Sequence, residues 1–252
     1  MQKGGLRTKG ITKKTASEKP LITVITVVYN GEKTLEQTIQ SVLNQTYDNV
    51  EYIVIDGESS DNTLEIIKKY ENRIDYWQSE PDKGIYDAMN KGIGMATGDY
   101  IALLNADDWY EIWACELIAK EIIKKKVDVY HGVIKILDEY DKVIKVEGNS
   151  TSLIANVMIA HPTCFVSKRI YEKKKYDTNY KSAADYDFVN YLVKVGAVFC
   201  FIPEIFANFR IGGMSSNKIG AIETAKIQLK YKHISIIKYL LKYLLIHLRT
   251  SK

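Results

Sequence analysis

The chain has 252 residues, of which 46% are apolar and 26% are charged, a balance typical of a globular protein with a sizeable core. Its three cysteines lie far apart without a CxxC pair, which excludes a disulfide framework and a cysteine-rich zinc site and suits a reducing compartment. No apolar run reaches the roughly 18 residues of a membrane-spanning helix, and no secretory signal is expected.

The net charge of +4 is unevenly distributed along the chain. Residues 1–20 contain six basic residues and one acidic residue, and residues 226–252 contain seven basic residues and no acidic one. Residues 21–225 between them contain 22 basic and 30 acidic residues. Basic ends can bind nucleic acid or anionic lipid, or they simply keep a protein soluble. Residues 1–20 are also polar and aperiodic, so we expect a disordered basic arm. No nucleic-acid partner is expected, because the basic residues lie in tails and not on a folded face that combines basic and aromatic residues.

Segments typical of strands and of helices alternate from residue 21 to residue 120. Short β-branched runs predict buried strands, and apolar residues at helical spacing predict the helices between them. The alternation predicts βαβ crossovers, and therefore an α/β fold with a mainly parallel, twisted sheet flanked by helices. The expected strands are 21–28, 52–56, 74–77 and 100–104, and the expected helices are 33–44, 64–67, 85–95 and 109–120.

The pattern is less regular after residue 126. Residues 127–146 predict two strands joined around 138–141, residues 163–166 are strand-like, and a helix is expected over 185–192.

Residues 234–248 form a strongly apolar segment near the end of the chain. Lys238, Lys242 and His247 interrupt it. At helical pitch Lys238, Lys242 and Arg249 share one face, which predicts a C-terminal amphipathic helix. Fifteen helical residues span about 22 Å, less than the ~30 Å of a bilayer core. We expect the helix to lie in a membrane interface, and the alternative is a helix packed on the domain or in a dimer interface.

Acidic turns follow two of the expected strands. Asp56 ends the strand 52–56, and Asp107 and Asp108 follow the strand 100–104, so parallel topology predicts that the three carboxylates share one cleft. Adjacent carboxylates repel each other unless a cation lies between them, and hard oxygen ligands favour Mg²⁺ or Mn²⁺, which commonly carry a substrate diphosphate. The alternative is that Asp108 caps the helix 109–120. Because the sequence has no GxGxxG, Walker or GxSxG motif, a metal bridge is the main device left for holding phosphate.

Four blocks of sequence lie in the first half of the chain: VITVVYN (24–30), SVLNQT (41–46), IVIDGESSD (53–61), and NKG with ATGDYI and LNADD within 90–108. In order and spacing, these blocks together resemble the family 2 glycosyltransferases. This resemblance implies a GT-A fold, a nucleotide-diphosphate sugar donor with UDP as the default, a divalent cation (Mn²⁺ or Mg²⁺) and inversion at the anomeric carbon.

The resemblance assigns donor contacts to residues in three turns. It implies that Asp107 and Asp108 are the carboxylates that hold the metal and the diphosphate. The chain departs from the family in two places, since Gly57 stands where a second acid is common and Asn105 stands where the acidic turn often begins with Asp. The residues assigned to the donor are Val27, Tyr29, Asn30, Asp56, Asn105 and Asp107.

Residues 80–90 resemble a loop of a bacterial subgroup that builds surface polysaccharides. Asp82 and Asp87 are candidates for donor contact, Asp87 the weaker one. Alternatively, Asp82 shapes a Pro-Asp-Lys-Gly turn and Asp87 faces solvent.

An inverting transfer needs a base to remove the proton of the acceptor hydroxyl. Asp185 matches the family's catalytic position at the start of a helix, although Ala184 replaces the frequent preceding Glu. The alternative is that Asp185 only caps this helix, and Asp187 is a weaker candidate base.

Two further polar residues resemble family positions in the second half. His161 lies in a segment similar to the acceptor side, and a structural histidine is the alternative. Arg210 begins the turn RIGGMSS, which resembles a loop that closes over the diphosphate, and an ordinary surface turn is the alternative.

Together these observations predict an inverting, metal-dependent glycosyltransferase of GT-A fold. Its domain is expected over 21–220, with a donor half at about 21–126 and an acceptor half at about 127–220, followed by a basic amphipathic tail over 221–252. The expected acceptor is a glycan or a polyprenol-linked molecule in surface polysaccharide synthesis, at the inner face of the cytoplasmic membrane, and a homo-oligomer is possible. The alternatives are an inactive sugar-nucleotide binder or membrane scaffold, and a sugar-1-phosphate nucleotidyltransferase.

Overall fold

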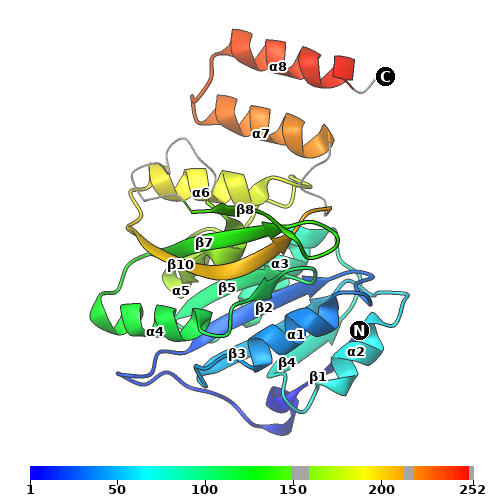
Figure 1. Ribbon diagram of the computed structural model, residues 1–252, viewed down its shortest axis with the longest axis vertical. Coiled ribbons are helices and arrows are strands. Elements are labelled where there is room, and N and C mark those ends of the chain that lie inside the picture. The colour runs from blue at the N-terminus through cyan, green and yellow to red at the C-terminus, as the bar shows by residue number, and fades with distance from the viewer. Residues whose placement is uncertain (149–158, 213–217, 250–252) are drawn as a thin grey trace.

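A ten-stranded sheet with helices on both faces forms the body of the molecule (Figure 1). The structure is a computed structural model that describes residues 1–148, 159–212 and 218–249. The strand order is β1-β4-β3-β2-β5-β9-β7-β10-β6, and β8 pairs with β7 outside this path.

Four parallel strands form the first half of the sheet. They are β2 (Ile22–Val28), β3 (Val50–Asp56), β4 (Tyr76–Ser79) and β5 (Tyr100–Asn105), and β2 lies between β3 and β5. The connecting helices are α1 (Leu35–Leu43), α2 (Thr63–Lys69) and α3 (Ile85–Met95). All residues of β2 and β3 are buried, as expected for β-branched strands covered on both faces. This half confirms the parallel α/β arrangement that the sequence predicts.

The two faces of the sheet belong to two separate apolar cores, because successive side chains of a strand point to opposite sides. In β3, Tyr52 and Val54 pack with residues of α1 and α4, whereas Ile53 and Ile55 pack with residues of α3 and α6. The sheet is therefore a rigid, fully covered support for the turns at its edge.

The second half of the sheet mixes strand directions. β7 (Val129–Leu137) and β8 (Val143–Glu147) form the expected antiparallel pair, and β10 (Phe199–Arg210) runs parallel to β7. β9 (Phe165–Ser167) joins the halves, antiparallel to both β5 and β7. The helices here are α4 (Ala114–Lys124), α5 (Lys168–Lys173) and α6 (Ala184–Lys194).

The predicted helix over 109–120 begins too early. Trp109 and Tyr110 form the short strand β6 (Trp109–Tyr110), which pairs antiparallel with Ala207 and Asn208 of β10, and α4 starts at Ala114. Here the pairing with a strand almost a hundred residues later in the chain outweighs the local helical pattern.

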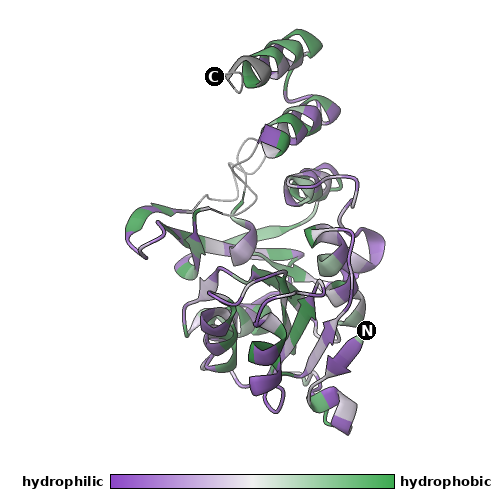
Figure 2. Ribbon diagram, turned by 90° about the vertical axis from the view of Figure 1, so that its right-hand side faces the viewer, coloured by the Kyte–Doolittle hydropathy of each residue, from purple (hydrophilic) through white to green (hydrophobic). Residues whose placement is uncertain are grey.

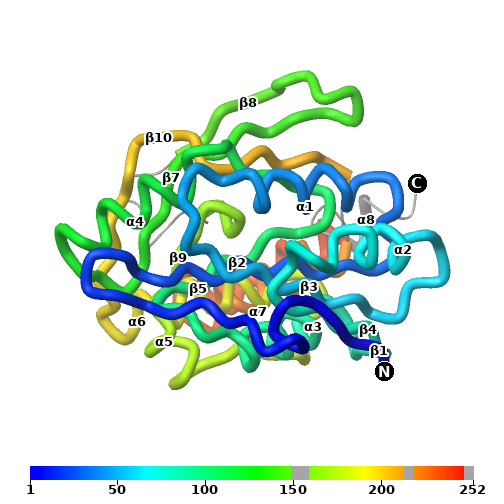
Figure 3. The backbone as a smooth tube through the Cα atoms, turned by 90° about the horizontal axis from the view of Figure 1, so that it is seen from below, coloured from blue at the N-terminus to red at the C-terminus, as the bar shows by residue number. Residues whose placement is uncertain are grey.

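The expectation of a disordered basic arm over 1–20 is wrong. β1 (Gln2–Gly4) pairs antiparallel with β4, and a 3-10 helix follows at Leu6–Lys9. The basic side chains bind this arm to the body, since Arg7 pairs with Glu51 at 3.4 Å and Lys13 pairs with the buried Asp75 at 2.9 Å. Figure 3 shows the dark blue arm running beneath the sheet, where it contacts the amino ends of β3, β4 and β5.

Two helices follow β10 and lie beyond α6 (Figure 1). They are α7 (Lys218–Lys230) and α8 (Ile236–Arg249), which pack against each other. The predicted tail over 221–252 thus contains most of α7, which contacts α6, and the expected amphipathic helix α8. No helix in the described ranges is long and apolar enough to cross a membrane.

Candidate active site

The polar turns predicted to share a cleft do meet at one edge of the sheet. In the parallel register, Val28 lies opposite Asp56, Val27 lies opposite Asn105, and Asp56 lies opposite Ser79. The turns after β2, β3, β4 and β5 are therefore neighbours at the carboxyl ends of these strands. This is the edge at which open α/β sheets bind their ligands.

The turn that contains Asp107 and Asp108 is held firmly between α1 and β10. The Thr38 hydroxyl contacts the carbonyl oxygens of Ala106 and Asp108, at 3.0 and 2.7 Å. The Asp108 side chain is fully buried, and its Oδ1 accepts a hydrogen bond from the backbone N–H of Arg210 at 3.3 Å. Because Asp108 precedes a strand and not a helix, the alternative that it caps a helix is excluded.

The electrostatics of this turn favour a cation. Burial raises the pKa of Asp107, and burial together with the neighbouring charge of Asp107 raises the pKa of Asp108 well above its usual range. Asn105 Oδ1 and Asp108 Oδ2 are buried without a hydrogen-bond partner in the described structure. Oxygen donors gathered in this way fit Mg²⁺ or Mn²⁺. The described residues contain no group of three or more His, Cys, Asp or Glu that could hold a metal.

Arg210, which the resemblance assigns to the diphosphate, lies over the same turn. Its Nη1 donates to the carbonyl oxygen of Asp107 at 3.3 Å, and the guanidinium lies 4.9 Å from the ring centroid of Trp109. Asp141, in the turn between β7 and β8, accepts hydrogen bonds from Nε and Nη2 at 3.0 and 2.6 Å. The sequence analysis did not identify Asp141. The remainder of the proposed loop, at 213–217, lies outside the described residues.

Two residues assigned to the donor, Val27 and Asp56, have buried side chains. Val27 is 5% exposed and its side chain belongs to the core. Asp56 is fully buried, and its carboxylate accepts hydrogen bonds from the hydroxyl groups of Ser59 and Ser79, at 2.5 and 2.7 Å. Asp56 therefore stabilises the turn after β3, and its assignment to the donor stays a prediction.

Tyr29 and Asn30, by contrast, are exposed at the end of β2. Tyr29 is 67% exposed. Asn30 has a left-handed backbone with φ of 52°, and its Oδ1 accepts a hydrogen bond from the backbone N–H of Ser60 at 2.9 Å. Asn30 thus connects the turn after β2 to the turn after β3, and it leaves the Tyr29 ring facing solvent.

The loop between β4 and α3 brings Asp82 to this edge. Asp82 is half-buried, and its Oδ1 accepts a hydrogen bond from the N–H of Gly84 at 2.7 Å, which is the turn-shaping contact expected as the alternative. Asp87 accepts a hydrogen bond from the N–H of Lys83 at 3.1 Å and lies 3.6 Å from Lys91 Nζ. Asp87 therefore stabilises the loop between β4 and α3 through its contacts with Lys83 and Lys91.

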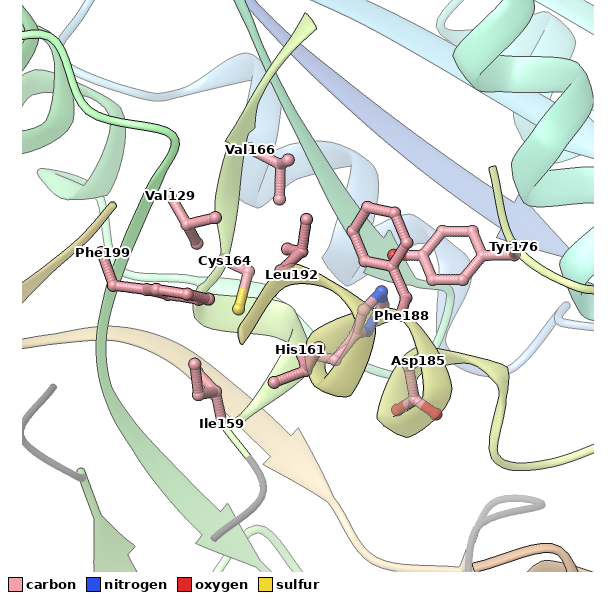
Figure 4. A pocket seen from close by; sticks show the side chains of 11 residues that line it. Val129, Ile159, His161, Cys164, Val166, Tyr176, Asp185, Phe188, Leu192 and Phe199 are labelled. Atoms are coloured by element: carbon pink, nitrogen blue, oxygen red, sulfur yellow. The ribbon is translucent and has the colours of Figure 1, made fainter. Parts of the chain in front are cut away.

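Asp185 lines a mostly apolar pocket with His161 (Figure 4). The hydroxyl of Tyr86, a residue of α3 that the sequence analysis did not identify, lies 3.1 Å from Asp185 Oδ1 and donates to it. Burial and the charge of Asp185 raise the pKa of Tyr86, so this phenol remains a hydrogen-bond donor. Burial lowers the pKa of His161, the Asp185 charge partly opposes that shift, and His161 Nε2 has no hydrogen-bond partner in the described structure.

The first turn of α6, which carries Asp185, is anchored by α7. Glu223 of α7 is buried, and its carboxylate accepts hydrogen bonds from the backbone N–H groups of Lys181, Ser182 and Ala183 at 2.8 to 3.1 Å. Asp187 is 1% exposed and pairs with Lys230 at 2.6 Å, which makes it part of the α6–α7 contact and not a free base. No local pattern in the sequence indicates Glu223, because its partners lie about 40 residues earlier.

Comparison with known proteins identifies relatives over most of the chain. Residues 23–198 match the family model described as Glycosyl transferase family 2. An uncharacterized glycosyltransferase of Haemophilus influenzae is 27% identical over 244 residues, covering 88% of this chain and 75% of that protein.

Two solved structures share the fold. The crystal structure of S. aureus TarS 1-349 in complex with UDP-GlcNAc has a TM-score of 0.69 at 17% identity, covering 90% of this chain and 72% of the other. The mannosyltransferase PcManGT from Pyrobaculum calidifontis, in complex with GDP-Man and Mn²⁺, has a TM-score of 0.63 at 15% identity, covering 84% of this chain and 63% of the other. These likenesses confirm the GT-A glycosyltransferase fold.

Proposed function

This chain belongs to glycosyl transferase family 2, and we propose that it moves a sugar from a nucleotide-diphosphate donor, UDP-linked by default, to an acceptor hydroxyl with inversion. The observation that carries the proposal is the Asp107–Asp108 turn at the carboxyl edge of the sheet, where Arg210 donates to the carbonyl oxygen of Asp107. Asp185 lines a mostly apolar pocket, where Tyr86 of α3 donates to its carboxylate.

In the proposed reaction, Arg210 binds the diphosphate and stabilises the negative charge that develops as this group leaves. Asp107, half-buried and beside Arg210, is the carboxylate best placed to hold Mn²⁺ or Mg²⁺ together with substrate oxygens. When bound, such an ion would neutralise part of the diphosphate charge. Asp108 is fully covered, so its main contribution is to hold the end of β10, and with it Arg210, against the turn.

Asp185 is the proposed general base. Tyr86 donates to its Oδ1, which fixes the carboxylate and leaves Oδ2 to take the proton of the acceptor hydroxyl. An oxygen deprotonated here attacks the anomeric carbon on the face opposite the diphosphate. The sugar–diphosphate bond breaks as the new glycosidic bond forms, and the configuration inverts.

The function is tested first by thermal unfolding with and without Mn²⁺, in the presence of UDP, GDP, CDP or dTDP. We expect one nucleotide to raise the Tm by about 5 °C at ~100 times its Kd, and only when metal is present. If none of the four nucleotides raises the Tm, a scaffold protein is favoured. Binding without turnover of the matching nucleotide sugars would favour an inactive sugar-nucleotide binder, and formation of a nucleotide sugar from a sugar 1-phosphate would favour the nucleotidyltransferase alternative.

We further propose that α8 binds the surface of an anionic membrane, which fits a polyprenol-linked acceptor at the inner face of the cytoplasmic membrane. Charge supports this choice, since residues 226–252 contain seven basic residues and no acidic one. Figure 2 shows α8 beyond α7, at the end of the molecule, with many apolar residues in green. Six apolar side chains, each 53–68% exposed, form a stripe at helical spacing: Ile236, Ile237, Leu240, Leu241, Leu244 and Leu245.

The double variant Leu240→Glu, Leu244→Glu should reduce sedimentation with vesicles that contain phosphatidylglycerol by at least about tenfold. The change removes apolar side chains that would be buried in the membrane, and the added negative charge opposes attraction to the anionic lipid. Ile219→Glu, at an exposed apolar position of α7, is the matched control and should leave binding unchanged. If the double variant instead dissociates a dimer, and the wild-type protein does not bind the vesicles, the apolar stripe is a contact between copies of the chain.

A further inference from the structure

The helix that carries Asp185 has a start that its own sequence does not cap. α6 begins at Ala184, and Ala183 at the N-cap position makes no side-chain hydrogen bond. Residues 174–183, which lead into the helix, form neither helix nor strand. The position of the first turn of α6 therefore depends on contacts with more distant parts of the chain.

Glu223 of α7 supplies such a contact. Figure 1 shows α7 beside α6, and the buried Glu223 carboxylate lies where three consecutive backbone N–H groups converge. Its Oε1 accepts a hydrogen bond from Lys181 at 2.8 Å, and its Oε2 accepts from Ser182 and Ala183 at 2.9 and 3.1 Å. Hydrogen bonds to a charged, buried acceptor are stronger than neutral ones, so Glu223 fixes the backbone directly before the helix.

Two contacts thus determine where the Asp185 carboxylate lies. Tyr86 of α3 donates to its Oδ1 at 3.1 Å, and Glu223 holds the backbone from which the side chain extends. Ala183 and Ala184 between them are 4% and 1% exposed, so this backbone is enclosed by packing as well. A base must lie within hydrogen-bond reach of the proton that it removes, and a displacement of about 1 Å can cost about 100-fold in rate.

The proposed diphosphate site is held by other elements. The turn of Asp107 and Asp108 is bound by Thr38 of α1 and by the backbone of Arg210 at the end of β10. A change at Glu223 should therefore displace Asp185 and leave nucleotide binding intact.

We propose that Glu223 is a positioning residue of the transfer reaction, which holds Asp185 where it meets the acceptor hydroxyl. This inference rests on the function proposed above, in which Asp185 is the base. It also changes the meaning of the C-terminal segment. α7, most of which the sequence assigns to a tail outside the glycosyltransferase domain, becomes a part of the protein on which the chemical step depends.

The test is a double-mutant cycle on the kcat of sugar transfer, with Glu223→Gln, Asp185→Asn and both changes together. Glu223→Gln keeps the size of the side chain but replaces one accepting oxygen with an NH₂ group, so it should lower kcat by about 30-fold. The Kd of the nucleotide and the number of nucleotide sites per chain, both from calorimetric titration, should stay unchanged. In the Asp185→Asn background, the same change should cost less than about twofold, because a side chain that takes no proton loses nothing by displacement.

Lys230→Gln, on the same helix, is the matched control. It removes the ion pair with the buried Asp187, so it should lower the Tm as Glu223→Gln does. The kcat per nucleotide site should nevertheless stay within about twofold of wild type, because the contact before Asp185 is untouched. If Glu223→Gln does not fold, Glu223→Asp keeps the charge but shortens the reach, and it should show the same pattern with a loss of about fivefold.

Two results would overturn the role of Glu223 alone. A wild-type kcat in the Glu223 variants is one, and an equal fold loss of kcat in the presence and absence of the Asp185 carboxylate is the other, since the effect would then not act through the base. A wild-type protein that transfers no sugar from any nucleotide sugar would overturn the proposed function together with this inference.

Discussion

Asp185→Asn is expected to lower sugar transfer by about 10³-fold while nucleotide-diphosphate binding stays within about twofold of wild type. Asn has the shape of Asp and can still accept the hydrogen bond from Tyr86, so the pocket should keep its geometry. It cannot take a proton from the acceptor hydroxyl. The measurement is the initial rate of transfer to the acceptor, together with calorimetric titration of the nucleotide.

Asp187→Asn is the matched comparison, two residues further along α6. Its carboxylate is buried against Lys230, so the change should lower the Tm, with transfer per folded molecule largely retained. Near-full turnover in Asp185→Asn would refute the base assignment. Loss of nucleotide binding in the same variant would mean that Asp185 contacts the donor and not only the acceptor.

Asp107→Asn should weaken metal-dependent nucleotide binding by about 100-fold, because it removes the charged ligand that the ion shares with the diphosphate. Asp108→Asn should have a smaller effect, since an amide oxygen can still accept the hydrogen bond from the Arg210 N–H. Both affinities are measured by titration with and without Mn²⁺.

The pair of variants also decides how many carboxylates hold the ion. Equal losses would make both residues ligands, as the sequence predicts, and unchanged metal dependence in Asp107→Asn would place the ion elsewhere. Because the pKa values of both carboxyl groups are raised, protons should compete with the metal at higher pH than for an ordinary Asp. Metal-dependent stabilisation should therefore weaken as the pH falls.

Long-range contacts account for the errors in the sequence analysis. The N-terminal arm looks disordered because it is polar and aperiodic, yet Lys13 and Arg7 bind carboxylates 62 and 44 residues away. The helix expected from Trp109 gives way to β6, whose partner strand lies about a hundred residues later. In both cases, the stabilising partner is distant in the chain, so composition and local periodicity carry no signal for it.

The sequence by itself determined the alternation of β2, β3, β4 and β5 with their helices, because buried parallel strands require β-branched runs and short crossovers. It also determined that Asp107 and Asp108 would lie at the carboxyl edge, since that edge follows from strand direction. Only the tertiary structure decided which carboxylates remain available there. It brings Ser79 to the buried Asp56, places the Asp82 carboxylate beside Gly57 and anchors the segment before the helix of Asp185 through Glu223, all by contacts between segments that meet only when the fold is assembled.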